Sequence, residues 1–199
     1  MSKRKPIPKP QRKLAIILLE GETEEELYTE LINKYCRTTP KEVRNLRGNW
    51  NINGKICEKA AQVLLQNPDR ICNVFVCIDQ ERVEVPAYNH DLCEKALREK
   101  YKNFGQIVPV IANLMCESLF FLDIDGIYKF LKAPIAARNP QKYQNFRRLT
   151  HVHLSTLFKQ HGKLYNKGHR CANFIRCLDL NKLKKAEEIK RLLEHLDSI

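Results

Sequence analysis

Residues 14–26 read LAIILLEGETEEE, and in this stretch an apolar run ends abruptly at the carboxylate of Glu20. A short, continuous apolar run is typical of a strand that is buried on both faces of a parallel sheet. Thr23 and Glu26 have the spacing of a capping box at the start of a helix. The helix behind them is expected to bury one face, which carries Leu27, Tyr28, Leu31, Ile32 and Tyr35. The stretch therefore predicts a strand, a tight turn at a glycine and a helix.

The same alternation of strands and helices continues to about residue 131. Short apolar runs predict strands, and the helical spacing of apolar residues predicts the helices between them. The expected strands are 44–50, 71–78 and 106–112, and the expected helices are 55–66, 89–102 and one or two within 114–131. This order favours an α/β fold, with a mostly parallel, Rossmann-like sheet that is flanked by helices.

After Lys132 the pattern changes, because Pro134 and Pro140 bracket a loop and only helical segments follow, at about 151–160, 168–178 and 181–197. The chain is therefore predicted to have three parts. These parts are a basic arm at 1–13, an α/β domain at 14–131 and a basic helical extension at 132–199. The basic arm has too few apolar side chains to fold by itself.

The charge of the chain is unevenly distributed. The whole chain carries a net charge of +12, yet residues 14–128 contain 13 basic and 18 acidic side chains. Residues 129–191 contain 16 basic and three acidic side chains, a net charge of +13. A surface this basic usually binds a polyanion, most often nucleic acid. The alternative is a charged surface that serves only solubility.

Two features of the sequence bear on where the protein works. No apolar run approaches the roughly 20 residues that cross a bilayer. The first ten residues, MSKRKPIPKP, lack the apolar region of a secretion signal. We therefore expect a cytoplasmic protein that does not associate with membranes. Its eight cysteines are then expected to be reduced and mostly buried.

Acidic side chains follow two of the predicted strands at the point where each strand ends. Glu20 follows the first strand, Asp79 follows the strand at 71–78, and Glu24 and Glu81 lie a few residues further on. In open α/β sheets, ligands bind at the edge where the carboxyl ends of the strands meet. Carboxylates that lie close together repel one another unless a cation binds among them. Their oxygens suit Mg²⁺ or Mn²⁺, which can activate water for attack on a phosphodiester.

Three segments of the sequence resemble one known family. Residues 20–24, EGETE, resemble the EG-x-TE motif that opens the Toprim-like domains of RloB-type and OLD-type nuclease relatives. Residues 79–81, DQE, lie where Toprim domains carry an Asp-x-Asp motif, with Glu81 in place of the second Asp. Residues 115–123, MCESLFFLD, resemble a later segment of the same group. The order and spacing of the three segments match over residues 14–131.

The resemblance implies a metal-binding catalytic fold that topoisomerases, primases and nucleases share. It implies that Glu20, Asp79 and Glu81 are catalytic residues that bind the metal, with Glu24 and Glu117 in support. The catalytic tyrosine of a topoisomerase does not accompany these motifs. The resemblance also suggests a role in defence against phages or mobile elements, beside a partner ATPase.

The basic extension supplies the candidate contacts to nucleic acid. Cations can hold phosphates, and aromatic rings can stack on unpaired bases. The rings of Tyr143, Phe146 and Tyr165 have an alternative role, which is to pack on the sheet domain. The candidate contacts are Lys142, Arg147, Arg148, Lys163, Lys167 and Arg170.

The segment 151–177 also offers groups for catalysis. Lys167 and Arg170 can stabilise the charge that develops on a phosphate, and His169 is the candidate general base. Four histidines and two cysteines lie in this segment. Their spacing matches no zinc-binding pattern, so zinc is not expected.

These observations together predict a Mg²⁺-dependent nuclease that acts on DNA or RNA. A first alternative is a non-catalytic nucleic-acid-binding subunit, because acids at a helix start are favoured by the helix dipole without any further role. A second alternative is another phosphotransfer reaction such as primer synthesis. That reaction needs a nucleotide pocket, and the sequence has no glycine-rich phosphate loop.

Overall fold

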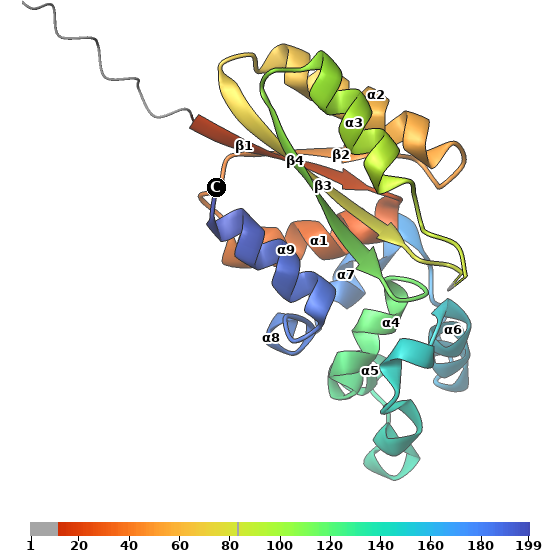
Figure 1. Cartoon of the computed structure of the whole chain (residues 1–199). Coiled ribbons are helices and arrows are strands. Elements are labelled where there is room, and N and C mark those ends of the chain that lie inside the picture. Colours follow the sequence, from red (N-terminus) through yellow and green to blue (C-terminus); the bar gives the residue numbers. More distant parts are fainter. Residues whose placement is uncertain (1–11, 83) are drawn as a thin grey trace, which may run out of the picture.

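The computed structural model describes residues 12–82 and 84–199, so the predicted basic arm lies almost entirely outside the described residues. One sheet contains the four strands β1 (Arg12–Leu19), β2 (Lys41–Asn45), β3 (Arg70–Asp79) and β4 (Phe104–Ala112). Their order is β2-β1-β3-β4, and all neighbouring pairs are parallel. The prediction of an α/β fold with a parallel sheet between helices is confirmed, and the arrangement is consistent with a Rossmann-like fold (Figure 1).

Helices cover both faces of the sheet, and the central strand β1 contributes to both cores because its side chains alternate between faces. The even-numbered residues of the run 14–19 pack against α2 (Ile52–Gln66) and α3 (His90–Lys100). The odd-numbered residues pack against α1 (Glu22–Tyr35) and α9 (Glu187–Asp197). Figure 1 shows these two pairs of helices on opposite sides of the strands. The run has no polar residue because both of its faces are buried.

The chain after β4 is helical, as the sequence predicts, and it joins the core that α1 and α9 form. Its buried side chains belong to one hydrophobic cluster with those of α1 and the sheet. The packing therefore continues without a break across residue 131, where the sequence places a domain boundary. The additional helices are α4 (Glu117–Phe120), α5 (Ile124–Leu131), α6 (His151–Gln160), α7 (Ala172–Ile175) and α8 (Leu180–Leu183).

Two local predictions are wrong. The second strand ends at Asn45 instead of continuing to residue 50, because the backbone turns through left-handed conformations at Arg47 and Gly48. The helix α1 starts at Glu22 without a side-chain cap, so Thr23 lies inside its first turn. The Thr23 hydroxyl accepts a hydrogen bond from the Gly168 amide at 2.9 Å and does not form the capping box. Thr23 thereby ties the start of α1 to the C-terminal part of the chain.

Two further observations concern the whole described part of the chain. None of the helices in residues 12–82 and 84–199 is both long and apolar enough to cross a membrane. All eight cysteines are free thiols, and six of them are buried, as expected.

Candidate metal centre

The carboxyl ends of β1 and β3 lie side by side in the sheet. Leu19 of β1 pairs with Cys77 of β3, so the residues that follow them meet at one edge. A cleft of about 440 Å³ opens at this edge. It is lined by six of the predicted site residues, which are Glu20, Glu24, Asp79, Glu81, Glu117 and Lys167. The structure therefore brings together side chains that are far apart in the sequence.

Backbone hydrogen bonds orient the two carboxyl groups that follow the strands. The Asp79 amide donates a hydrogen bond to Oε2 of Glu20 at 2.9 Å. The Cys116 amide, at the start of α4, donates to Oδ1 of Asp79 at 2.8 Å. Among the described residues, the second oxygen of each carboxyl group has no hydrogen-bond partner. Each group therefore has a fixed position and an oxygen that can bind a ligand.

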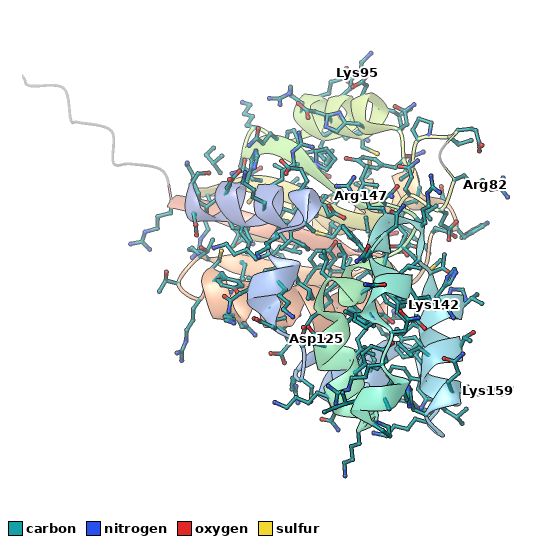
Figure 2. The ribbon with its side chains drawn as sticks, turned by 90° about the horizontal axis from the view of Figure 1, so that it is seen from below. Arg82, Lys95, Asp125, Lys142, Arg147 and Lys159 are labelled. Carbon is teal, nitrogen blue, oxygen red and sulfur yellow. The ribbon has the colours of Figure 1, made fainter. Side chains whose placement is uncertain are left out.

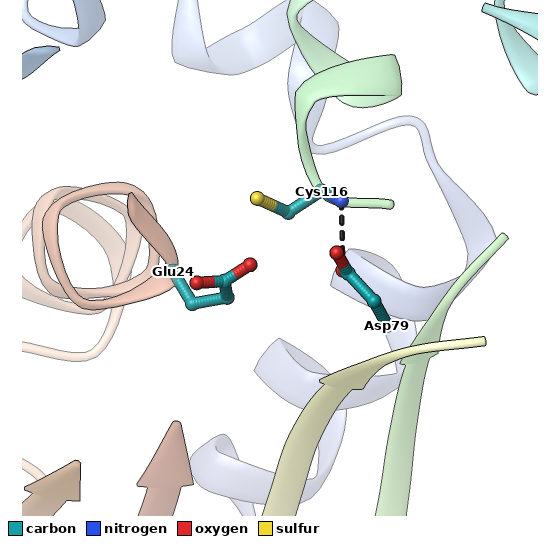
Figure 3. A group of neighbouring side chains, drawn as sticks. All are labelled: Glu24, Asp79 and Cys116. Atoms are coloured by element: carbon teal, nitrogen blue, oxygen red, sulfur yellow. Dashed lines mark hydrogen bonds between the residues drawn. The ribbon is translucent and has the colours of Figure 1, made fainter. Parts of the chain in front are cut away.

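A third carboxyl group and a thiol complete a buried cluster around Asp79. Glu24 lies in the first turn of α1 and is only 7% exposed, and Cys116 is fully buried. A carboxyl oxygen of Glu24, a carboxyl oxygen of Asp79 and the sulfur of Cys116 all lie within 4.8 Å of one another. Figure 3 shows the three side chains converging from α1, from the end of β3 and from the start of α4. In the part of the chain that the structure describes, this is the one group of its kind, and it could hold a metal ion.

Glu117 and Lys167 add an ion pair to the cleft. Glu117 is 2% exposed, and its Oε1 lies 3.1 Å from Nζ of Lys167. The Tyr165 hydroxyl approaches the same oxygen at 3.5 Å. Burial lowers the pKa of Lys167, but its attraction to Glu117 outweighs this and raises the pKa, so the ammonium group stays charged. Lys167 is the one lysine or arginine of the described residues that forms an ion pair with a carboxyl group of the cleft, and Nε2 of His169 lies 3.9 Å from Oε1 of Glu22 at its edge.

Three carboxyl groups of the cleft, those of Glu20, Glu24 and Asp79, have raised pKa values. Burial, together with repulsion from Glu24, Glu20 and Glu117, raises the pKa of Asp79 to about 9. Burial also raises the pKa of Glu20 and of Glu24, and repulsion from neighbouring carboxylates adds to the effect. At neutral pH, Asp79 therefore keeps its proton unless a cation replaces it.

The cluster in Figure 3 differs from the predicted metal ligands Glu20, Asp79 and Glu81 at two positions. Glu81 lines the cleft, but its side chain is exposed and its backbone is left-handed, with φ of 47°. Its Oε2 accepts a hydrogen bond from Nδ2 of Asn49 at 2.8 Å. Glu20 is turned toward the Asp79 amide. Glu81 therefore lies at the rim of the cleft, and Glu20 lies beside the buried cluster.

Sequence reasoning missed two residues of the site, Cys116 and His151. Burial raises the pKa of the Cys116 thiol well above its ordinary value, so the thiol is protonated at neutral pH. His151 begins α6 and lines the cleft, where its Nδ1 lies 3.3 Å from Sδ of Met115. The sequence offered one signal for Cys116, its position directly before Glu117. It offered none for His151, because α6 reaches the cleft only through tertiary packing.

His169 and Arg170 do not line the cleft. Nδ1 of His169 lies 2.7 Å from Oε1 of Glu26, and this hydrogen bond raises the pKa of His169. Arg170 borders a separate, largely apolar cavity of about 410 Å³. Of the three residues predicted for general-base or phosphate contacts in this segment, Lys167 alone reaches the cleft.

The other predicted phosphate contacts fall into two groups. Lys142, Arg147 and Arg148 are exposed on short 3₁₀ turns between α5 and α6, and Figure 2 labels the first two of them. Lys163 is half-buried, and its Nζ donates to the carbonyl of Phe130 at 2.7 Å. The same Nζ also lies over the aromatic ring of Phe130, 4.5 Å from its centroid. Lys163 therefore holds the C-terminal segment in place, whereas the exposed Lys142, Arg147 and Arg148 are available to a ligand.

The aromatic rings of the C-terminal segment are mostly packed inside the protein. Tyr143 is buried and stacks on Phe121, with ring centroids 5.3 Å apart. Tyr165 is half-buried and meets Phe158 edge-on, with centroids 5.4 Å apart. Tyr143 and Tyr165 therefore pack within the protein, as the alternative role predicts, and their rings do not offer a face to unpaired bases.

Comparisons with known proteins were made for both the sequence and the structure. No family model, no curated protein and no solved structure matches the chain.

Proposed function

We propose that the protein is a Mg²⁺- or Mn²⁺-dependent phosphodiesterase that cleaves nucleic acid at a Toprim-like site. The observation that carries this proposal is the convergence of Glu20, Glu24, Asp79 and Glu117 on one open cleft. Placing carboxyl groups together in a half-buried site is unfavourable, as the raised pKa of Asp79 indicates. A divalent cation that binds among these carboxyl groups offsets their repulsion, and the four side chains then form a metal site.

The donor atoms of the cleft fit a hard divalent cation. Glu20 and Asp79 each have an oxygen without a hydrogen-bond partner in the described residues, and Glu24 is close to Asp79. We assign these three carboxyl groups as the ligands, since oxygen is the preferred ligand atom of Mg²⁺ and Mn²⁺. The protonated Cys116 thiol is a poor ligand for such an ion. When bound, the ion would activate water and stabilise the leaving oxygen of a phosphodiester.

Lys167 is the residue that we assign to the reacting phosphate. Its side chain is about half exposed, and its charged ammonium group lies 3.1 Å from Glu117 at the cleft. An ammonium group in this position can stabilise the negative charge that develops on the phosphate oxygens. The resting ion pair with Glu117 holds the ammonium group beside the carboxylates until a substrate arrives.

The 3₁₀ turn that carries Arg147 and Arg148 is held against the loop between β4 and α4. The carbonyl of Arg147 accepts a hydrogen bond from Asn113 at 3.1 Å. Asn113 belongs to the same β4–α4 loop as Cys116, whose amide holds Asp79. Arg147 and Arg148 therefore lie beside the loop that positions Asp79, and we assign them, with Lys142 of the preceding turn, to phosphates further along the strand.

A cleavage assay tests the proposed function. Labelled single- and double-stranded DNA and RNA are incubated with the protein in Mg²⁺, Mn²⁺ or EDTA. We expect cleavage in the presence of metal, no cleavage in EDTA, and a loss of at least about 100-fold in rate for Asp79→Asn. The matched control is Asp125→Asn, because Asp125 is an exposed aspartate that pairs with Lys182 outside the cleft. Equal cleavage by both variants would contradict the proposal.

The second candidate is a nucleic-acid-binding subunit without catalytic activity. It is favoured by the ion pair between Lys167 and Glu117 and by the proton on Asp79, which together neutralise part of the cluster without a metal. Such a protein would bind nucleic acid equally well in Mg²⁺ and in EDTA. It would cleave no substrate, and Asp79→Asn would leave its affinity unchanged.

A further inference from the structure

Three neighbouring hollows, together called the groove, lie at the carboxyl edge of the sheet. The cleft shares Glu20, Asp79 and Glu81 with a neighbouring hollow of about 120 Å³. That hollow shares Ile52 and Pro86 with a larger cavity of about 590 Å³. Because each shares lining residues with the next, the three spaces adjoin one another.

Trp50 lies in the loop that borders this groove. It is the sole tryptophan of the protein and it is 80% exposed. Its neighbours Asn49 and Ile52 both line the hollow next to the cleft. Burying a tryptophan side chain is strongly favourable in a protein interior, so the exposed ring contributes little to the stability of the free protein.

The loop that carries Trp50 is held by polar contacts, not by packing of the ring. The Gly48 amide donates to the carbonyl of Glu20 at 2.7 Å. Nζ of Lys55 donates to two carbonyls of the loop, at 2.9 and 3.1 Å. Arg47 has a left-handed backbone, with φ of 56°, which is unfavourable for a residue with a side chain. The loop is therefore fixed to the strand end that carries Glu20. Gly48 and Asn49 of this loop line the cleft and the neighbouring hollow, and the Trp50 ring beside them is exposed to solvent.

We propose that Trp50 stacks on an unpaired base of the strand in this groove, so that the substrate is single-stranded beside the cleft. This inference rests on the proposed function and adds the class of substrate to it. Stacking on a flat ring requires an open base face, which bases inside a duplex do not offer. Arg82 is exposed, lines the same groove and has no ion pair within the described residues, so it can hold the adjoining phosphate.

The sole tryptophan makes the test direct, because all tryptophan fluorescence comes from Trp50. The protein is titrated in EDTA with oligothymidylate and oligouridylate of about 20 nucleotides and with a duplex of the same length. We expect single strands to quench the fluorescence and the duplex to leave it nearly unchanged. In parallel, the anisotropy of labelled strands reports binding itself. Trp50→Ala should weaken single-strand binding roughly 5- to 150-fold, and Trp50→Phe should keep most of the affinity.

The matched control is Ile135→Ala, because Ile135 is similarly exposed, at 83%, but lies on the 3₁₀ turn Ile135–Ala137, none of whose residues lines the three spaces, whereas the loop of Trp50 contributes Gly48 and Asn49 to their lining. This variant should bind single strands as the wild type does. If single strands bind without quenching and Trp50→Ala binds them normally, this inference is overturned while the proposed function survives. If no nucleic acid binds at all, the proposed function fails as well. An equal loss of duplex binding in Trp50→Ala would also overturn the preference for single strands.

Discussion

Asp123 and Asp79 are both aspartates in the interior of the protein, yet their surroundings are opposite. Asp123 is 3% exposed and accepts three hydrogen bonds: from Nζ of Lys182 at 2.7 Å and from two backbone amides at 2.8 and 3.2 Å. Asp79 accepts one, from the Cys116 amide at 2.8 Å, and faces other carboxyl groups. Asp123 is therefore surrounded by hydrogen-bond donors, whereas Asp79 has a single donor.

The pKa values of the two groups follow from this difference. Burial raises the pKa of Asp123, but the hydrogen bonds from Lys182 and the two amides outweigh burial and lower it below its ordinary value. At Asp79, burial and like charges act in the same direction and raise the pKa to about 9. Asp123 is therefore an ionised structural group that ties α8 to the start of α5. Lys167 pairs with Glu117 in the cleft, but no cation of the described residues pairs with Asp79, and we propose that a metal ion binds there.

Removing the structural aspartate should have the largest effect on stability. Asp123→Ala deletes an ion pair and leaves the buried Gly126 amide and the partly buried Asp179 amide without an acceptor, so we expect the free energy of unfolding to fall by about 3 kcal/mol. Urea denaturation measures this loss. The control is Asp125→Asn, which affects only the exposed partner of Lys182 and should change stability by less than about 0.5 kcal/mol. A loss below about 1 kcal/mol for Asp123→Ala would show that Asp123 is not the anchor we describe.

Removing the functional aspartate should have a smaller effect of opposite sign. In EDTA at neutral pH, Asp79→Asn replaces a carboxyl group that must take up a proton to fold, because burial and the neighbouring Glu24 and Glu20 raise its pKa to about 9. We expect the variant to be more stable than the wild type by roughly 2 kcal/mol. Thermal and urea unfolding in EDTA measure the difference. A variant less stable than the wild type would mean that Asp79 contributes to the fold as Asp123 does.

The pH dependence of stability should distinguish the two aspartates. The folded-state pKa of Asp79, about 9, lies above its ordinary value of 3.8, so the folded protein binds the extra proton between these values. The contribution of Asp79 is therefore fully favourable below about pH 4 and is lost as the pH rises toward 9, by at most ~1.4 kcal/mol per pH unit. Asp123 has a lowered pKa, so its contribution is lost as the pH falls.

Unfolding free energies of the wild type and Asp79→Asn in EDTA, measured from about pH 5 to pH 8, isolate this contribution. The advantage of the variant should grow steadily with pH. An advantage that stays constant over this range would contradict the raised pKa of Asp79.

Much of the fold could be predicted because the strands are nearly pure apolar runs. The run 14–19 is buried on both faces, and its polar neighbours mark where it ends. The loop after β2 could not be predicted, because its shape depends on left-handed residues such as Arg47 and on contacts from Lys55. The capping box failed for a similar reason, since the Thr23 hydroxyl bonds to Gly168 in a distant segment.

The candidate site could be predicted as far as strand ends determine it. Glu20 and Asp79 follow adjacent parallel strands, so their meeting at one edge follows from the topology. The contribution of Cys116 could not be predicted, because it depends on how the loop after β4 folds back over Asp79. Asp123 is the last residue of the segment 115–123, which resembles the Toprim-like group. In the structure it forms an ion pair with Lys182 and does not line the cleft, so the resemblance alone does not tell a structural acid from a site residue.

Direct measurement of Mn²⁺ binding by electron paramagnetic resonance tests the central claim, that the Asp79 cluster binds a divalent cation. The comparison is between the wild type, Asp79→Asn, Glu24→Gln and Asp123→Asn, each shown to be folded by circular dichroism. We predict that the wild type binds Mn²⁺ and that Asp79→Asn and Glu24→Gln weaken binding at least about tenfold. Asp123→Asn should bind as the wild type does. No binding by the wild type, or equal binding by all four proteins, would contradict the account.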